Sequence, residues 1–185
     1  MAEMIVYGDG DFSTSKWSGG VTTELFIWPE GASYAERRFD FRISTALVEL
    51  EESRFTSLPG VERYLTPLCE SGFSLAINGR APVRLGKGSV LRFSGADDIT
   101  CYGSGRDLNL MLKGRVGDMK CLPACASYWL GKAEFAFVYA AEGMSVSLTD
   151  ENGTAIVRLE AGGFARISGS GCLSVTGNAV LFTVC

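Results

Sequence analysis

The chain of 185 residues carries a formal net charge of −4 at pH 7, and 46% of its residues are hydrophobic. This length suits one domain or two small ones with a sizeable core, and the lack of a basic stripe argues against nucleic acid as a partner. The sequence contains no histidine, which excludes a His-ligated metal site and a catalytic triad with a His base.

The N-terminal stretch MAEMIVYGDG lacks the positively charged region and long apolar region that are typical of a secretory signal. No segment approaches the ~18 consecutive apolar residues of a membrane span, so we expect a cytoplasmic protein with no membrane partner. Because a reducing compartment disfavours disulfides, we expect buried free thiols at the six cysteines, which are Cys69, Cys101, Cys121, Cys125, Cys172 and Cys185. The single Cys-x3-Cys spacing is a weak metal signal, and we expect no metal and no other cofactor.

The first distinctive segment is KWSGGVTTEL at residues 16–25. A glycine pair followed by hydroxyl side chains is typical of phosphate loops, but the chain has no Gly-x4-Gly-Lys-Ser/Thr pattern. We therefore expect the glycines to form a tight turn into a strand. That strand would carry Glu24 toward a polar cluster with Arg42, because a buried carboxylate is rarely left unpaired.

The segments that follow alternate between apolar and polar residues with a period of two, which predicts β-strands. They are RFDFRIS, GFSLAIN, SVLRFSG, DLNLML, EFAFVYAA, GMSVSL, TAIVRL and AVLFTV. Asn78-Gly79 and Asn152-Gly153 favour tight hairpins between them. Short, regularly spaced strands without a long helical stripe predict an all-β sandwich or barrel.

An internal repeat sharpens the predicted fold. Residues 85–95, LGKGSVLRFSG, and residues 159–169, LEAGGFARISG, share five identities at one offset. The segments before and after also pair in order, which indicates a duplicated β-unit. This pattern is typical of a bicupin, a double-stranded β-helix or jelly roll made twice. We expect a barrel at residues 1–113, and a second half at residues 114–185 packed against it in a single compact unit.

Four motifs in order give the chain a resemblance to the HutD/Ves family of metal-lacking bicupins. They are a Gly-rich T-x-E segment at 17–25, FDFRIS at 39–44, RFTSLPGVERYLTPL at 54–68 and DLNLML at 107–112. The family pattern has Asn where this chain has Trp17, and we expect the chain to depart from its relatives there. The resemblance implies a cytoplasmic small-molecule-binding protein, with some members linked to regulation of histidine utilisation.

With this resemblance, the polar strand residues become candidates for a ligand site in a barrel lumen. An arginine fork would bind the carboxylate of a small anionic metabolite. The candidate ligand-binding residues are Glu24, Arg42, Ser44, Arg63, Asn109, Asp107 and Trp17. Arg92 and Arg166, which occupy equivalent positions of the repeat, are expected to be structural or solvated.

Three alternatives stay open at this point. The alternating polar residues are also what a sheet with one face in water would show. A metal-independent isomerase or lyase would use Glu24 or Asp107 as base and Tyr64 or Tyr102 as acid. A homodimer formed by pairing of sheet edges is the third alternative.

Overall fold

A computed structural model describes residues 2–185 as strands, turns and one short 3₁₀ helix at Asp9–Asp11. The strands form two compact units. We call Phe12–Arg115 the N-terminal barrel, and we call Val116–Cys185 together with the N-terminal segment that ends at Asp11 the C-terminal barrel. The predicted all-β class is confirmed, because alternating short segments separated by glycine turns form strands almost throughout.

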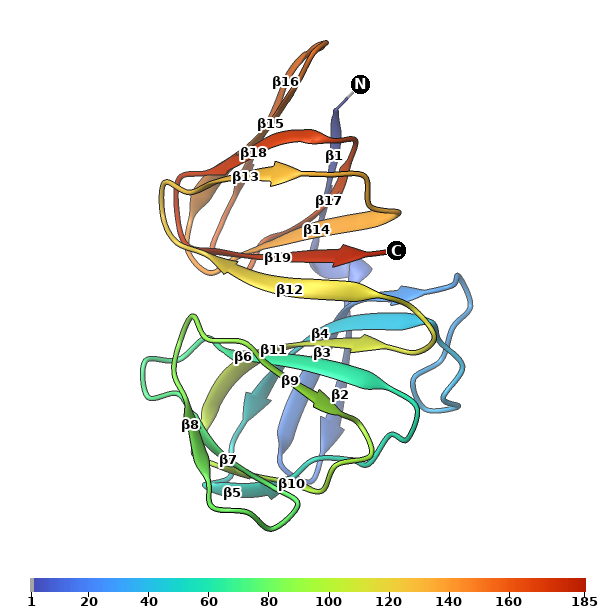
Figure 1. Cartoon of the computed structure of the whole chain (residues 1–185), viewed down its shortest axis with the longest axis vertical. Helices are drawn as coiled ribbons and strands as arrows, with labels where there is room; N and C mark the ends of the chain where they lie inside the picture. The colour runs from blue at the N-terminus through green and yellow to red at the C-terminus, as the bar shows by residue number, and fades with distance from the viewer. Residues whose placement is uncertain (1) are drawn as a thin grey trace. The chain divides into compact units, whose positions relative to one another are not determined.

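The N-terminal barrel consists of two antiparallel sheets (Figure 1). The larger sheet has the order β2-β3-β4-β11-β6-β9, with strands at Ser13–Trp17, Gly20–Trp28, Phe41–Val48, Gly105–Leu112, Glu62–Pro67 and Leu91–Ser94. The smaller sheet has the order β5-β10-β7-β8, with strands at Glu52–Arg54, Ile99–Tyr102, Phe73–Ile77 and Val83–Leu85.

The C-terminal barrel also has two antiparallel sheets (Figure 1). One has the order β1-β17-β14-β19-β12, with strands at Glu3–Tyr7, Phe164–Ser168, Phe135–Ala140, Ala179–Val184 and Gly117–Leu122. The other has the order β13-β18-β15-β16, with strands at Ser127–Leu130, Gly171–Val175, Met144–Asp150 and Gly153–Leu159.

Eight strands of each barrel are arranged in the same order. The series β4-β11-β6-β9 and β5-β10-β7-β8 recur as β12-β19-β14-β17 and β13-β18-β15-β16, with every strand number raised by eight. The repeated segments at 85–95 and 159–169 fall on corresponding elements, the end of β8 through β9 and the end of β16 through β17. The predicted jelly-roll duplication therefore agrees with the topology.

The first strand modifies the predicted domain boundaries. Residues 1–113 were expected to form the first barrel, but β1 pairs with β17 from Glu3↔Ser168 to Tyr7↔Phe164. This antiparallel ladder satisfies the backbone groups of β17 on that side, so β1 belongs to the C-terminal barrel. The boundary after the N-terminal barrel lies at Arg115, two residues from the predicted position.

Each barrel has its own apolar core between its two sheets. In the N-terminal barrel, the core at one end includes Leu65, Phe73, Leu75, Phe93 and Ile99. In the C-terminal barrel, the interior is filled with aliphatic side chains from both sheets. They include Val138, Val146, Leu148, Leu173 and Leu181.

Truncation of a side chain in the core of the C-terminal barrel should lower the free energy of unfolding more, the more deeply that side chain is buried. We expect Leu148→Ala to lower the free energy of unfolding by roughly 2–5 kcal/mol, because it removes a fully buried side chain and leaves a cavity. The matched control is Ile156→Ala on the neighbouring strand β16, where the side chain is 67% exposed; its effect should stay within about 0.5 kcal/mol. Denaturant titration measures both, and equal effects would contradict the assignment of the core.

Candidate functional site

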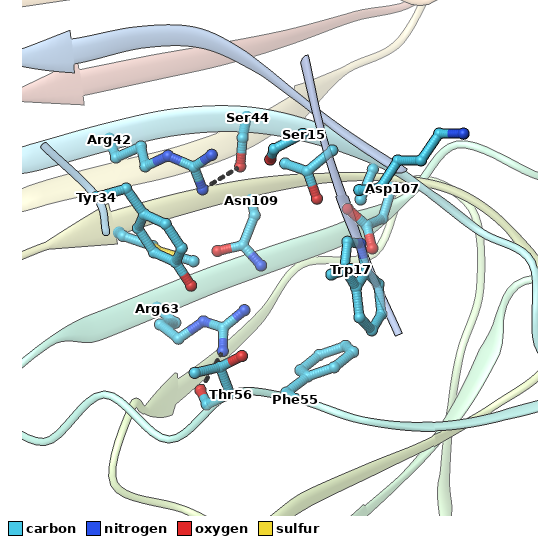
Figure 2. Close-up of a pocket in the computed structure, with 14 residues that line it drawn as sticks. Ser15, Trp17, Tyr34, Arg42, Ser44, Phe55, Thr56, Arg63, Asp107 and Asn109 are labelled. Carbon is cyan, nitrogen blue, oxygen red and sulfur yellow. Dashed lines mark hydrogen bonds between the residues drawn. The ribbon is translucent and has the colours of Figure 1, made fainter. Parts of the chain in front are cut away.

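The N-terminal barrel contains a cavity of about 200 Å³. Its wall is made chiefly by β2, β4 and β11, together with single residues of β3 and β6 and the segments around Tyr34 and Phe55. Figure 2 shows Arg42, Arg63, Ser44 and Asn109 directed into this space from different strands. Six of the seven predicted site residues line it, and these are Trp17, Arg42, Ser44, Arg63, Asp107 and Asn109.

The strand register explains why residues far apart in the sequence meet here. Asn109 on β11 lies opposite Ser44 on β4. Met111, two residues further along β11, lies opposite both Arg42 on β4 and Arg63 on β6. Because side chains alternate between the two faces of a strand, these residues share one face of the sheet.

That polar face is buried. Arg42, Arg63, Asp107 and Asn109 are between 3% and 6% exposed. The alternative of a sheet with its polar face in water is therefore wrong for this sheet. Charged and amide groups removed from water need partners, so their pairing decides what the cavity can hold.

Arg42 has partners within the protein. Its Nε donates to Glu24 Oε2 at 2.6 Å, and one of its terminal nitrogens donates to Ser44 Oγ at 3.3 Å. The guanidinium also lies over the Tyr34 ring, 4.2 Å from its centroid, which adds a cation–π interaction. The predicted pairing of Glu24 with Arg42 is observed. Glu24 itself does not line the cavity.

A β-bulge gives Glu24 this position. The register of β3 against β4 shifts between Glu24 and Phe26, so that Glu24 pairs with Ser44 while Phe26 pairs with Ile43. A regular strand would place Phe26 on the face of Glu24. The bulge inserts one residue and turns the two side chains to opposite faces.

Arg63 is less well satisfied than Arg42. It packs against the rings of Phe55 and Phe93, with its guanidinium carbon 5.1 Å from each centroid. Within residues 2–185 its one hydrogen bond is a long contact of 3.5 Å to the carbonyl of Thr56, and its Nε has no partner. Burial lowers the pKa of Arg63 to about 10, so the side chain is still a cation at neutral pH.

Asp107 is the only carboxylate among the residues that line the cavity. Burial raises its pKa to about 7, although the nearby Arg63 and a hydrogen bond from the backbone of Ala46 act in the opposite direction. Desolvation of the charged form outweighs these stabilising interactions. The carboxyl group in the cavity therefore titrates much closer to neutral pH than an ordinary aspartate does.

Trp17 and the glycines after it have linked roles. A Cβ on Gly19 would lie 2.2 Å from the indole of Trp17, and a Cβ on Gly20 would lie 1.9 Å from the carbonyl oxygen of Leu47. The glycine pair thus permits the β2–β3 turn, as the sequence predicted, and it also permits close packing of the indole. The indole Nε1 of Trp17 and the Oδ1 of Asn109 are buried without a hydrogen-bond partner.

The structure adds residues that the sequence did not single out. Tyr34 and Phe55 line the cavity and contact its two arginines. Phe55 lies within the recognised 54–68 motif and could have been found, whereas nothing in the pattern around Tyr34 marks it. The rest of the added lining is Ser15, Lys16, Thr22, Ala46, Thr56 and Met111.

The tyrosines predicted as catalytic acids lie elsewhere. Tyr64 pairs with Leu110 on the opposite face of the sheet, and its hydroxyl contacts Glu62. Tyr102 ends β10 and is 37% exposed. Neither lines the cavity, so the predicted carboxylate–tyrosine pair is not assembled there.

The repeated arginines differ in their surroundings. Arg92 is solvated and forms an ion pair with Glu62. Arg166 lies over the ring of Phe135, 5.0 Å from its centroid. Neither lines the cavity, as expected of structural or solvated residues.

The remaining predicted features are quickly placed. All six cysteines are free, but only Cys101 is fully buried as expected. Cys125 and Cys185 are exposed, and the other three are partly buried. Among residues 2–185 no three acidic or cysteine side chains gather as a group that could hold a metal ion. No helix in the same range has the length and apolar character needed to cross a membrane.

The duplicated barrel provides an internal comparison for the site. In β11 and β6, Met111 lies opposite Arg63; in the equivalent strands β19 and β14, Thr183 lies opposite Ala136. Counting along these registers places Ala179 at the position of Asp107 and Leu181 at that of Asn109. In the second copy, Ala136 therefore stands at the position of Arg63. The positions of Asp107 and Asn109 are likewise taken by alanine and leucine.

The equivalents of Arg42 and Ser44 differ in another way. They are Asp118 and Lys120, which form an ion pair with each other. Both side chains are more than 40% exposed. The buried polar cluster is therefore a property of the N-terminal barrel alone among the two copies.

Two successive jelly-roll barrels of the same topology define the chain as a bicupin. The family model for HutD matches residues 9–182, and the chain belongs to the HutD family. No curated protein sequence matches the chain.

Solved structures give the same assignment of the fold. HutD from Pseudomonas fluorescens SBW25 superimposes with a TM-score of 0.80 at 21% identity, covering 98% of both chains. A conserved protein of unknown function from Pseudomonas aeruginosa PAO1 gives a TM-score of 0.81 at 21% identity, with the same coverage. A cupin 2 conserved barrel domain protein from Leptotrichia buccalis gives 0.55 at 15% identity, covering 92% of this chain and 91% of its own.

The buried carboxyl group should make stability depend on pH. Because the pKa of Asp107 is raised in the folded state, the unfolded chain loses this proton first as pH rises. The folded protein should therefore lose a few kcal/mol of stability between about pH 4 and pH 7. Asp107→Asn, which keeps the shape and removes the titration, should flatten this dependence in urea titrations. Glu52→Gln, at an exposed site on β5, should leave it unchanged, and a slope unaltered by Asp107→Asn would refute the assignment.

Proposed function

We propose that this bicupin binds a small anionic metabolite inside the N-terminal barrel and acts as a non-catalytic regulatory protein. The observation that carries the proposal is the contrast between the two barrels. One copy of the fold fills its interior with aliphatic side chains, and the other holds two arginines, an aspartate and an asparagine around a cavity. Since buried polar groups destabilise a core that can be built without them, a ligand role accounts for their presence.

Arg63 is the group that we assign to the ligand carboxylate. Arg42 already neutralises Glu24 at 2.6 Å, whereas the Nε of Arg63 has no partner. A planar guanidinium with unused donors matches a carboxylate in a two-bond geometry. Arg42 would then position Tyr34 and Ser44 at the wall of the site.

The ligand must be small. A cavity of about 200 Å³ corresponds to the liquid volume of about seven water molecules, and it is below the range of drug-sized pockets. Family membership suggests acids of histidine utilisation, and urocanate and N-formylglutamate are the first compounds to examine. Arg63 and the unpartnered Nε1 of Trp17 both offer donors to such acids.

An enzymatic alternative has one observation in its favour, the raised pKa of Asp107, which would suit a general base near neutral pH. The tyrosines expected to act as acids lie outside the cavity, which weighs against it. Prolonged incubation of each bound acid with the protein, followed by NMR, separates the two functions. We expect the compound to remain unchanged. Turnover would show that the protein is an enzyme and would contradict the proposed non-catalytic function.

Ligand binding should raise the melting temperature in proportion to the logarithm of ligand concentration above Kd. We expect urocanate or N-formylglutamate to produce this shift in the wild type. Arg63→Gln should reduce the affinity at least tenfold, because it removes the charge-assisted hydrogen bonds of the guanidinium. Differential scanning fluorimetry, with circular dichroism to confirm folding, provides the measurement.

The matched control is Arg92→Ala on β9 of the same barrel. Arg92 is solvated and pairs with Glu62 outside the cavity, so this variant should respond to ligand like the wild type. If neither acid shifts the melting temperature, the proposed ligand class is wrong. An equal response of the Arg63→Gln variant would instead show that the acid binds elsewhere.

A further inference from the structure

The carboxyl group of Asp107 has an unusual position for a site that binds an anion. It is 3% exposed and lines the same cavity as Arg63, the cation that we assign to the ligand. Within residues 2–185 it forms no ion pair at salt-bridge distance with either cavity arginine. A negative ligand held in this cavity would therefore meet a second acidic group in surroundings from which water is largely removed.

Asp107 is not needed to build its strand. The equivalent residue of β19 in the second barrel is Ala179, and that strand pairs with both of its neighbours throughout. The backbone of β11 is already secured by its pairing with β4 and β6 and by the hydroxyl of Thr45, which donates to the carbonyl of Asp107 at 2.7 Å. The fold itself therefore does not require a carboxyl group at this position, and the backbone contact of the side chain is the hydrogen bond that it accepts from Ala46.

The surroundings of Asp107 contain several charged or titratable groups. Arg63 on β6, Arg106 on β11 and Cys101 on β10 act on it electrostatically. Figure 2 shows its carboxylate beside the indole of Trp17, across the cavity from Arg42. The other such groups at this cavity are Lys16 on β2 and Tyr34, with Glu24 on β3 held against Arg42.

Two like charges at close range in a poorly hydrated cavity repel strongly, because the effective dielectric constant is far below that of water. Protonation of Asp107 removes the repulsion and creates an O–H donor for a ligand carboxylate. The charge of Arg63 then balances the one carboxylate of the ligand that lies beside it. Neutral Asp107 is the state that fits an anionic ligand in this site.

We propose that Asp107 is the proton-linked contact of the ligand site, so that the cavity takes up its anionic ligand together with one proton carried by this carboxyl group. The inference rests on the proposed function and assigns to that site a dependence on pH. Burial raises the pKa of Asp107 to about 7, so the proton is available near neutrality. The affinity for a carboxylate should be constant below this pH and should fall about tenfold per pH unit above it.

N-formyl-L-glutamate is a suitable probe, because its carboxyl groups are ionised throughout the range from about pH 6 to pH 8.5. Isothermal titration calorimetry of the full chain at about pH 8, in HEPES and in Tris, gives the number of protons taken up from the difference in apparent enthalpy. We expect close to one proton per bound ligand in the wild type. This measurement needs no variant.

Asp107→Asn supplies the second measurement. The amide keeps a hydrogen-bond donor without a titrating proton, so we expect it to bind N-formyl-L-glutamate with a Kd that changes less than about threefold over this range and to take up no proton. Glu52→Gln, at the exposed carboxylate of β5, should retain the proton uptake of the wild type.

The outcomes are distinguishable. Binding without proton uptake, or an affinity that rises with pH as it would if ionised Asp107 received a cationic part of the ligand, overturns the assignment of Asp107 and leaves the anion site standing. Proton uptake that persists in Asp107→Asn also overturns it. Absence of binding at every pH overturns the inference together with the proposed function.

Discussion

A charged side chain inside a β-barrel must be paired or it raises the free energy of the folded state, and this constraint organises the N-terminal barrel. Glu24 and Arg42 satisfy each other across β3 and β4. Arg63 and Asp107 occupy the same cavity without a comparable pair, and burial shifts the pKa of each toward its neutral form. The site thus combines the Glu24–Arg42 ion pair with two buried ionisable groups that lack a comparable partner.

The duplicated architecture shows that the fold does not require these buried polar groups. Both barrels use the same strand order, and the C-terminal barrel shows that aliphatic side chains are sufficient to fill it. β2 and the segments around Tyr34 and Phe55 complete the wall of the cavity, to which β4, β6 and β11 contribute polar side chains that the second copy lacks at the equivalent positions. The antiparallel ladders of these strands are retained, because side-chain identity on one face does not alter backbone pairing.

Much of the architecture could be predicted from the sequence. Period-two alternation identified the strands around Arg42 and Asn109, and the repeat identified the duplication, because both signals are local or depend on comparison along the chain. The first strand was assigned to the wrong barrel, since a five-residue edge strand carries no information on which sheet edge it joins. The bulge that turns Phe26 away from the face of Glu24 could not be predicted either, because a β-bulge has no reliable local signature.

The sequence by itself determined the all-β class, the two-fold repeat, the exclusion of histidine chemistry and the set of polar residues from which the site is built. Only the tertiary structure decided that the Nε of Arg63 has no partner, that Tyr34 joins the wall, and that the carboxyl group of Asp107 is buried. The physical reason is that alternation specifies the face of a strand, whereas burial and pairing depend on which other strands and loops cover that face.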